Sequence, residues 1–303
     1  MTDTASSKTA QPSRAMAWLL AARVKTLPAA AVPVAVGTAC AHVVGGVAWA
    51  AALCALFGAL AIQIGTNFAN DVSDAEKGAD GPDRQGPARA VSSGWISARH
   101  MKVAMIAAFG AAAGVGIYLI SVGGWPVVAI GVASIISGIA YTGGPYPLGY
   151  NGLGDIFVFI FFGPVAVLGT VWVQRFTVPS VAIWLSLPVG FLAAAILVVN
   201  NLRDRDTDVG VGKRTLAVRF GRRAALGQYA GLLLASAAVP IGLAVHYHAY
   251  WLLLPLVAAP LGLMRYRALV AARVGAQFNG LLAATAQLLM LYGVLLVAGL
   301  LLA

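Results

Sequence analysis

The strongest constraint on this chain is a series of apolar runs, most of them long enough to cross a lipid bilayer as a helix. A run of about 20 apolar residues spans the hydrocarbon layer, and lipid offers no partner to an unpaired backbone group, so such runs fold as helices. Of the 303 residues, 60% are hydrophobic and 10% are charged, which excludes an ordinary soluble domain. The sequence therefore predicts an all-α, polytopic membrane bundle of about nine transmembrane helices, at 27–44, 47–66, 103–122, 126–140, 156–173, 181–199, 224–245, 251–269 and 281–302.

The distribution of positive charge predicts how this bundle is oriented. With nine spans the termini lie on opposite sides of the membrane, and all of the 20 Lys and Arg residues except Arg175 fall on the N-terminal side. The positive-inside rule then places the N-terminus and the longer loops in the cytoplasm, in a plasma (inner) membrane. The net charge of +10 follows from this topology and does not indicate nucleic-acid binding. We expect residues 1–14 to be a disordered cytoplasmic segment and 15–303 to form a single transmembrane domain.

Half of the acidic residues lie in one stretch directly after the second span, NFANDVSDAEKGADGPDRQGPAR at 67–89. On a helix, Asn67, Asn70, Asp71 and Asp74 would project from one face, because they are spaced at i, i+3, i+4 and i+7. Carboxylates this close repel one another unless a cation compensates them, and oxygen ligands favour Mg²⁺. Protein-bound Mg²⁺ is usually shared with substrate phosphates, so the stretch predicts a site for a phosphorylated ligand. The alternative is a solvated acidic loop.

A second acidic stretch follows the sixth span and reads NNLRDRDTDVGVGKRTLAVRFG at 200–221. Asn200, Asp204 and Asp208 are spaced by four and would form one stripe on a helix that continues out of the membrane. Asp206 lies off this stripe and is not assigned to the site. The two acidic faces lie on the same side of the membrane, so they could close around a phosphate chain with Mg²⁺ between them.

Within each of these two stretches, positive residues follow the acidic cluster, where phosphate groups would need them. Guanidinium groups pair with phosphate oxygens through two parallel hydrogen bonds, and lysine adds a point charge. The positive-inside bias alone is the competing explanation for these residues. We predict phosphate contacts from Lys77, Arg84, Arg89, Lys213 and Arg214.

These stretches together closely resemble the UbiA superfamily of intramembrane prenyltransferases, and within it the branch that uses 1,4-dihydroxy-2-naphthoate in menaquinone biosynthesis. The resemblance runs from about residue 14 to the C-terminus. The superfamily pattern has a further Asp four residues after Asp74, where this chain has Gly78 followed by Asp80, and Asp80 is therefore not assigned as a ligand. The segments that carry the resemblance are RVKTLP at 23–28, the two acidic stretches, YTGGPYPLGYNGLGD at 141–155 and FVFIFFGPVAVLGT at 157–170.

The resemblance implies Mg²⁺-dependent transfer of a polyprenyl group from polyprenyl diphosphate to 1,4-dihydroxy-2-naphthoate. Carbon dioxide and diphosphate would be released, giving demethylmenaquinone. Tyr141 and the aromatic run at 157–162 would line a dry pocket for the allylic cation. Arg23 and Lys25 would hold either the naphthoate carboxylate or the diphosphate. Asn67 and Asn200 would contact substrate beside the five cations above. The implied catalytic residues are Asp71, Asp74, Asp204, Asp208 and Tyr141, and the implied metal ligands are Asn70, Asp71, Asp74, Asp204 and Asp208.

Three alternative functions are considered beside this one. The nearest is prenyl transfer to another aromatic acceptor, such as 4-hydroxybenzoate or homogentisate. A membrane transporter would also carry acidic residues, but it would place them near the middle of the membrane, whereas these gather at one side. A phosphatidyltransferase would hold metal with aspartates too, but the DG-x-x-AR run of that family is missing from the sequence.

Overall fold

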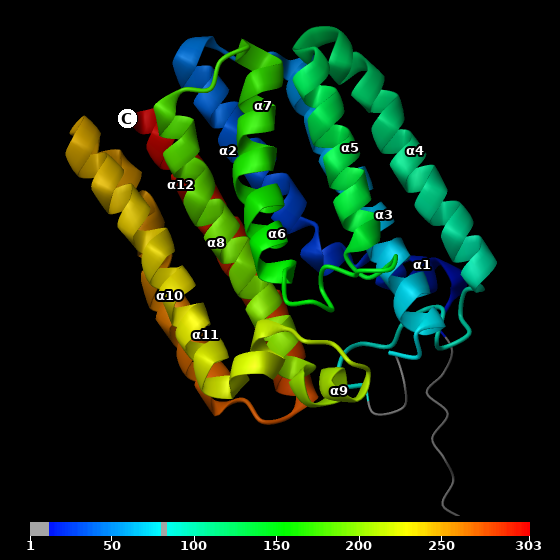
Figure 1. Ribbon diagram of the computed structural model, residues 1–303. Coiled ribbons are helices and arrows are strands. Elements are labelled where there is room, and N and C mark those ends of the chain that lie inside the picture. The colour runs from blue at the N-terminus through cyan, green and yellow to red at the C-terminus, as the bar shows by residue number, and fades with distance from the viewer. Residues whose placement is uncertain (1–11, 80–83) are drawn as a thin grey trace, which may run out of the picture.

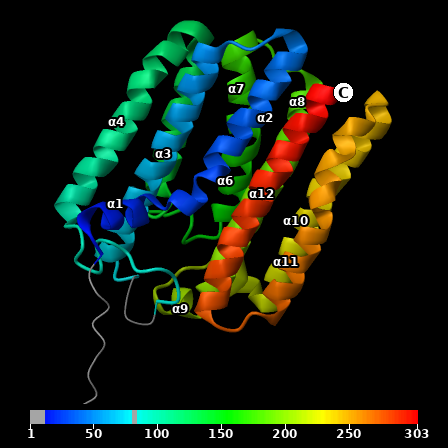
Figure 2. The same cartoon turned by 180° about the vertical axis from the view of Figure 1, so that it is seen from behind.

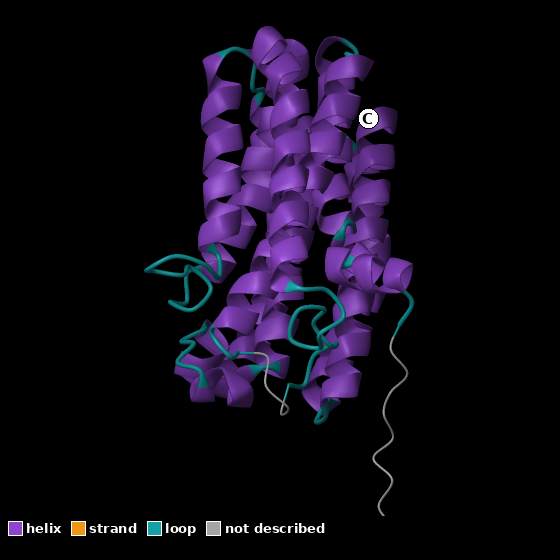
Figure 3. Ribbon diagram, turned by 90° about the vertical axis from the view of Figure 1, so that its right-hand side faces the viewer, coloured by secondary structure: helices purple, strands orange, loops and turns teal. Residues whose placement is uncertain are grey.

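The chain folds as a bundle of long helices, and the computed structural model describes residues 12–79 and 84–303. In the described residues the views show helices and loops only, with the helices running side by side along one direction (Figures 1 and 3). Most of the predicted disordered segment, and Asp80, lie outside the described residues. Arg14 begins the first helix. The Ser13 hydroxyl caps this helix by accepting a hydrogen bond from the N–H of Met16.

Each of the nine predicted spans corresponds to a helical segment of the described chain. Eight segments are long and apolar enough to cross a membrane, and α5 is shorter, as the sequence predicted for the fourth span. Two short helices are not among these segments: α1 precedes the first of them, and α9 lies between α8 and α10. The bounds are α1 Arg14–Ala22, α2 Pro28–Gly45, α3 Trp49–Glu76, α4 Ala98–Gly123, α5 Trp125–Ala140, α6 Gly154–Ile160, α7 Ala166–Arg175, α8 Ser180–Arg203, α9 Arg205–Gly210, α10 Leu216–Tyr247, α11 Ala259–Ala271 and α12 Gly275–Leu302.

Two helices continue past the end of their predicted membrane span, as the helical spacing of the acidic stretches predicted. α3 extends from its predicted end at residue 66 to Glu76, and α8 extends from residue 199 to Arg203. The added turns carry the polar residues of the two acidic stretches. Many of their polar side chains line an interior cavity, described below.

The acidic stretches lie at the same end of the bundle. Figures 1 and 2 show α1 and α9 at the lower end and the C-terminus at the upper end, so the described chain begins and finishes at opposite ends. The loops after α3, α5 and α9 also lie at the lower end. Arg175 ends α7 and donates to the carbonyl of Gly46 in the α2–α3 turn, at the other end from the acids. This arrangement is the one that the charge count predicted.

The main apolar core lies where α2, α7, α8, α10 and α12 pack together. The span that holds α6 and α7 is not a regular α-helix, because residues 161–165 form a π-helical turn around Pro164. At this turn Gly163 packs directly on the backbone of α8: a Cβ there would lie 2.9 Å from Gly190 Cα. Proline removes one helical hydrogen bond, and the π turn accommodates this loss within the bundle.

Candidate active site

A cavity of about 670 Å³ opens at the lower end of the bundle between the two acidic stretches. Its walls come from α1, α3, α8, α9, α12 and the loops after α3 and α5. Of the residues predicted from sequence, the structure brings to this cavity Arg23, Lys25, Asn67, Asn70, Asp71, Asp74, Arg84, Arg89, Tyr141, Asn200, Asp204, Asp208 and Lys213. Lys77 and Arg214 do not line it.

The four polar residues predicted for one face of α3 are almost completely buried. Asn67, Asn70, Asp71 and Asp74 each expose less than a tenth of their surface, because the loops cover this end of α3. The amide of Asn67 donates to the Ala22 carbonyl at 3.0 Å, which ties α3 to the end of α1. Buried polar groups are costly unless they are hydrogen-bonded, so each of these side chains has a specific partner.

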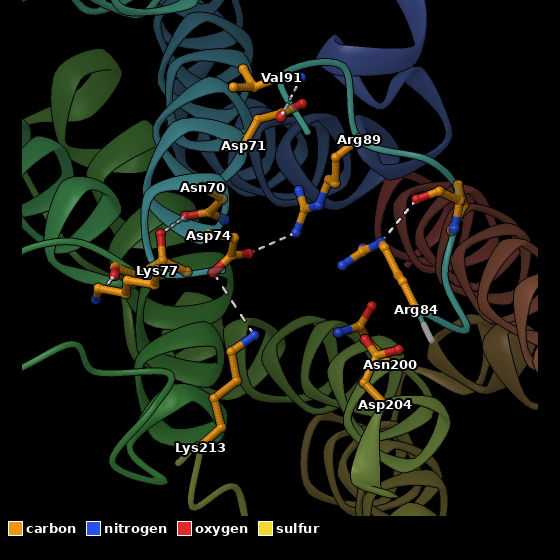
Figure 4. A network of polar contacts seen from close by, with 12 residues as sticks. Asn70, Asp71, Asp74, Lys77, Arg84, Arg89, Val91, Asn200, Asp204 and Lys213 are labelled. Atoms are coloured by element: carbon orange, nitrogen blue, oxygen red, sulfur yellow. Dashed lines mark hydrogen bonds and ion pairs between the residues drawn. The ribbon is translucent and has the colours of Figure 1, made fainter. Parts of the chain in front are cut away.

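Asp71 is held by backbone donors of the loop that follows α3. Its two oxygens accept hydrogen bonds from the N–H groups of Ala90 at 3.2 Å and Val91 at 3.1 Å. Figure 4 shows the Asp71 carboxylate turned toward Val91, whereas Asp74 points into the space between the helices. Asp71 therefore fixes the loop that carries Arg89.

Asp74 is the most heavily contacted acid of the site. Arg89 Nη2 lies 2.9 Å from Asp74 Oδ2, and the Tyr150 hydroxyl donates to Asp74 Oδ1 at 3.0 Å. Lys213 Nζ lies 3.8 Å from the same Oδ1 atom (Figure 4). Asp74 thus joins three segments that are distant in sequence: the end of α3, the α5–α6 loop and the α9–α10 loop.

The second acidic stretch does not form one continuous helix. α8 ends at Arg203 and α9 begins at Arg205, with Asp204 between them at φ −90° and ψ 1°. The predicted single helical stripe is therefore wrong in this detail, although the Asp208 N–H still donates to the Asp204 carbonyl at 2.8 Å. Asn200, Asp204 and Asp208 nevertheless all line the cavity.

Arg203 neutralises this second face. Its guanidinium donates to both carboxylate oxygens of Asp204, at 2.8 and 2.6 Å, and to Asn200 Oδ1 at 2.8 Å. A fourth bond, at 2.9 Å, reaches Asn279 of α12. Such a two-pronged contact between arginine and a carboxylate is among the strongest side-chain interactions. Arg203 is therefore a positioning residue for Asp204 and Asn200.

Lys213 connects the two faces. Its ammonium lies 3.5 Å from Asp208 Oδ1, in addition to its contact with Asp74. Burial raises the pKa of Asp208 to about 6, an effect that Asp204 and Asp74 strengthen and Lys213 opposes. The acids of the site are thus compensated by neighbouring cations and N–H groups, which the argument from charge repulsion did not anticipate.

The two predicted cations outside the cavity have structural contacts. Lys77 donates to the carbonyl of Thr142, and its ammonium lies 4.5 Å from the centre of the Tyr150 ring. The side chain of Arg214 is exposed, and its backbone N–H donates to the Tyr150 carbonyl at 2.7 Å. Both residues support the α5–α6 loop, and the predicted phosphate contacts of both remain predictions.

Three residues of the site were not singled out from sequence: Thr142, Tyr150 and Arg203. Thr142 donates to Asn70 Oδ1 at 2.8 Å, and Tyr150 and Arg203 make the contacts described above. Thr142 and Tyr150 lie in a loop without periodicity, so no spacing rule marks them. Arg203 directly precedes Asp204, and adjacent residues do not face each other on a regular helix.

The donor set fits Mg²⁺ only if the ion brings further oxygen ligands. In the described part of the chain, no three His, Cys, Asp or Glu side chains come close enough to hold a metal ion together. Mg²⁺ is commonly bound by one or two carboxylates with substrate phosphates and water. The cavity supplies carboxylates from both stretches and asparagine amide oxygens, which fits a metal–diphosphate complex; here the Asp71 oxygens accept from backbone N–H groups and the Asp204 oxygens from Arg203.

A second, apolar cavity of about 350 Å³ continues from this site into the bundle. The two cavities share the lining residues Gln63, Thr66, Tyr141, Val158 and Phe162, and Tyr141 therefore lies at their junction. The Tyr141 ring is closely enclosed: a Cβ at Gly154 would lie 2.7 Å from its hydroxyl oxygen, and one at Gly149 would lie 3.1 Å from its ring. A cavity lined by charged residues thus lies directly beside an apolar one, as an amphipathic substrate with an anionic head would require.

The chain belongs to the UbiA prenyltransferase family, whose model matches residues 30–279. It is an integral membrane protein of that family, with multiple spans.

Its relatives include the 1,4-dihydroxy-2-naphthoate octaprenyltransferases of Mycobacterium tuberculosis and Escherichia coli. The first is 42% identical over 81% of this chain and 83% of the relative, and the second is 40% identical over 83% and 84%. Among solved structures, the fold is similar to a UbiA homolog from Archaeoglobus fulgidus bound to DMAPP and Mg²⁺. That likeness has a TM-score of 0.66 at 15% identity and covers 92% of this chain and 98% of the other.

Proposed function

We propose that this protein transfers a polyprenyl group from polyprenyl diphosphate to 1,4-dihydroxy-2-naphthoate, in the pathway to menaquinone. The single observation that carries the proposal is the direct junction at Tyr141 between a cavity lined by acids and cations and an apolar chamber. The naphthoate acceptor is supported by the relatives that are 36 to 42% identical over most of this chain.

The reaction breaks the allylic carbon–oxygen bond and leaves the electron pair on the diphosphate. The ring forms a carbon–carbon bond to the allylic carbon, and loss of carbon dioxide returns an electron pair to the ring. The immediate product is the hydroquinone of demethylmenaquinone, and no oxidant is consumed. Arg89, Lys213 and Arg84 lie where they can bind the negative charge that develops on the diphosphate. Tyr141 and Phe162 shield the allylic centre from water.

The proposed metal ligands are Asn70, Asp71, Asp74, Asp204 and Asp208. A bound Mg²⁺ would neutralise the diphosphate and make it a better leaving group. The Archaeoglobus fulgidus homolog was solved with DMAPP and Mg²⁺, which supports this ligand class for the shared fold. Because Lys213 contacts Asp74 and Asp208, which are both proposed ligands, we propose that its ammonium shifts toward the diphosphate when the metal complex binds.

The acceptor carboxylate needs a cation outside the diphosphate position. Arg23 and Lys25 line the cavity where α1 ends. We propose that one of them binds the naphthoate carboxylate until it leaves as carbon dioxide. Asn67 and Asn200, which also line the cavity, complete the proposed substrate contacts.

We further propose that the active-site end faces the cytoplasm in the plasma (inner) membrane and that residues 15–303 act as one domain. The charge distribution supports this orientation, since the sequence places 19 of the 20 Lys and Arg residues on one side, and the remaining one, Arg175, contacts the α2–α3 turn. A transporter would place its acids near mid-membrane, whereas these lie at one end of the bundle.

The test is an assay of purified protein in detergent with Mg²⁺, a polyprenyl diphosphate and radiolabelled 1,4-dihydroxy-2-naphthoate, beside a parallel assay with 4-hydroxybenzoate. We expect a lipid-soluble prenylated naphthohydroquinone, recovered as the quinone after oxidation by air, that requires Mg²⁺ and is lost in Asp71→Ala and Asp208→Ala. Product from 4-hydroxybenzoate alone would keep the mechanism and change the acceptor. Folded protein that prenylates neither acceptor would contradict the proposal.

A further inference from the structure

Two glycines in the apolar chamber are not explained by helix packing. Glycine in a membrane helix usually lets a neighbouring backbone approach closely. Gly138 of α5 fits that rule, since a Cβ there would lie 2.3 Å from Thr66 Oγ1. Gly116 of α4 and Gly131 of α5 also line the chamber, yet a Cβ built on either would meet no atom within 4 Å. Their effect is to keep part of the chamber empty.

The chamber has a closed end far from the charged cavity. Leu119, Val127 and Val173 line it there and belong to a small apolar cluster with Ala51 and Trp172. Tyr141 marks the other end, next to the acids. The 14 residues between Val127 and Tyr141 correspond to about 21 Å at the rise of an α-helix, and the ten between Gly131 and Tyr141 to about 15 Å. The two open glycines therefore lie deep in the chamber, near its closed end.

The position of these glycines suggests what they select. A tail that enters at Tyr141 reaches Gly131 only if it is several isoprene units long, whereas a short tail ends before it. Val128 and Val132, on either side of Gly131 in α5, line the chamber and are 42% and 52% exposed, so this part of α5 borders both the chamber and the outside of the bundle. A long tail can fill the space beside Gly116 and Gly131 and leave the bundle along this part of α5.

We infer that Gly116 and Gly131 are specificity-determining residues that admit long polyprenyl tails. This inference rests on the proposed function. A larger side chain at either position fills the empty space and removes the deep part of the chamber. Long tails then lose buried contacts in the deep part of the chamber. Short tails end between Tyr141 and these glycines and are unaffected.

The experiment compares geranyl diphosphate with octaprenyl diphosphate as donors for Gly116→Leu and Gly131→Leu. We expect kcat/KM for the octaprenyl donor to fall at least tenfold, while that for the geranyl donor stays within twofold. Gly114→Leu is the matched control: Gly114 lies on α4, and a Cβ there also meets nothing within 4 Å, but it is exposed and does not line the chamber. This control should change kcat/KM for neither donor.

Equal losses with both donors in folded protein, or no loss with either, would overturn the inference. Where a leucine variant does not fold, Gly116→Ala and Gly131→Ala are compared by the same ratio of kcat/KM for the octaprenyl donor to kcat/KM for the geranyl donor. We expect a smaller fall in this ratio for the alanine variants. Wild-type protein that prenylates no aromatic acceptor would instead contradict the proposed function. The two failures are distinguishable, because the first is a change in the donor ratio and the second is the absence of wild-type turnover.

Discussion

The Tyr150 hydroxyl donates a hydrogen bond to Asp74 Oδ1 at 3.0 Å, and the ring that carries it is contacted by two ammonium groups. Lys77 Nζ and Lys213 Nζ lie 4.5 and 4.7 Å from the ring centre, and ammonium groups at this distance are attracted by the face of an aromatic ring. One side chain of the α5–α6 loop therefore fixes an acid of α3 and a lysine of the α9–α10 loop.

Tyr150→Phe and Tyr150→Leu should separate these two effects. Phenylalanine removes only the hydrogen bond to Asp74, and bonds to charged groups contribute about 1.5–3 kcal/mol, so we expect the apparent Mg²⁺ affinity to fall about tenfold. Leucine also removes the ring face that holds Lys213, so the KM for polyprenyl diphosphate should rise as well. Steady-state kinetics over Mg²⁺ and donor concentrations measure both. Tyr146→Phe, in the same loop but 61% exposed, is the control and should behave as wild type. Identical kinetics for the two Tyr150 variants would contradict this assignment.

Arg203→Met should destabilise the protein because it leaves the Asp204 carboxylate unpaired. The two side chains are 4% and 14% exposed, and breaking such a buried pair costs about 3–5 kcal/mol. We expect a lower unfolding temperature in detergent without Mg²⁺. The double variant Arg203→Met/Asp204→Asn removes the unpaired charge and should recover most of the loss. If the double variant is no more stable than the single one, the pairing is not what Arg203 contributes.

The sequence predicts the bundle well because span number depends on the length of apolar runs, which lipid makes obligatory. It also predicts that Asn67, Asn70, Asp71 and Asp74 share a side of α3, since helical spacing alone decides that. The helical continuation predicted from the spacing of the acidic stretches is present to Glu76 in α3, but in α8 it ends at Arg203.

The charge compensation inside the site could not be predicted from spacing. Arg203 reaches Asp204 because the chain leaves the α-helix between α8 and α9, a break that the i, i+4 pattern of Asn200, Asp204 and Asp208 does not indicate. Asp71 accepts from backbone N–H groups, which carry no side-chain signal at all.

Gly163→Ala should destabilise the bundle at its π-helical turn. A Cβ there would lie 2.9 Å from both Gly190 Cα and the Ser186 carbonyl oxygen, and these are backbone atoms that cannot rotate away. Overpacking of this kind costs about 1–3 kcal/mol, to be measured by thermal unfolding in detergent. Gly227→Ala makes the same change on α10, where a Cβ meets nothing within 4 Å, and should leave stability unchanged or slightly raised. Equal effects of the two substitutions would rule out the packing explanation.

Binding of Mg²⁺ should weaken as the pH falls through the pKa of Asp208. Burial raises that pKa to about 6, with Asp204 and Asp74 adding to the shift and Lys213 opposing it. A metal binds the carboxylate and not the carboxylic acid, so protons compete with Mg²⁺ below this value. From pH 7.5 to pH 5 the ionised fraction of a group with a pKa of about 6 falls roughly tenfold, and the apparent Mg²⁺ affinity should fall with it.

The control for this prediction is Asp208→Asn, which should bind Mg²⁺ more weakly at pH 7.5 and show a flatter pH profile. The phosphates of the donor titrate equally in both proteins, so the difference between the two profiles, measured as the Mg²⁺ concentration for half-maximal activity, reports Asp208 alone. Parallel profiles would show that another group controls the pH dependence.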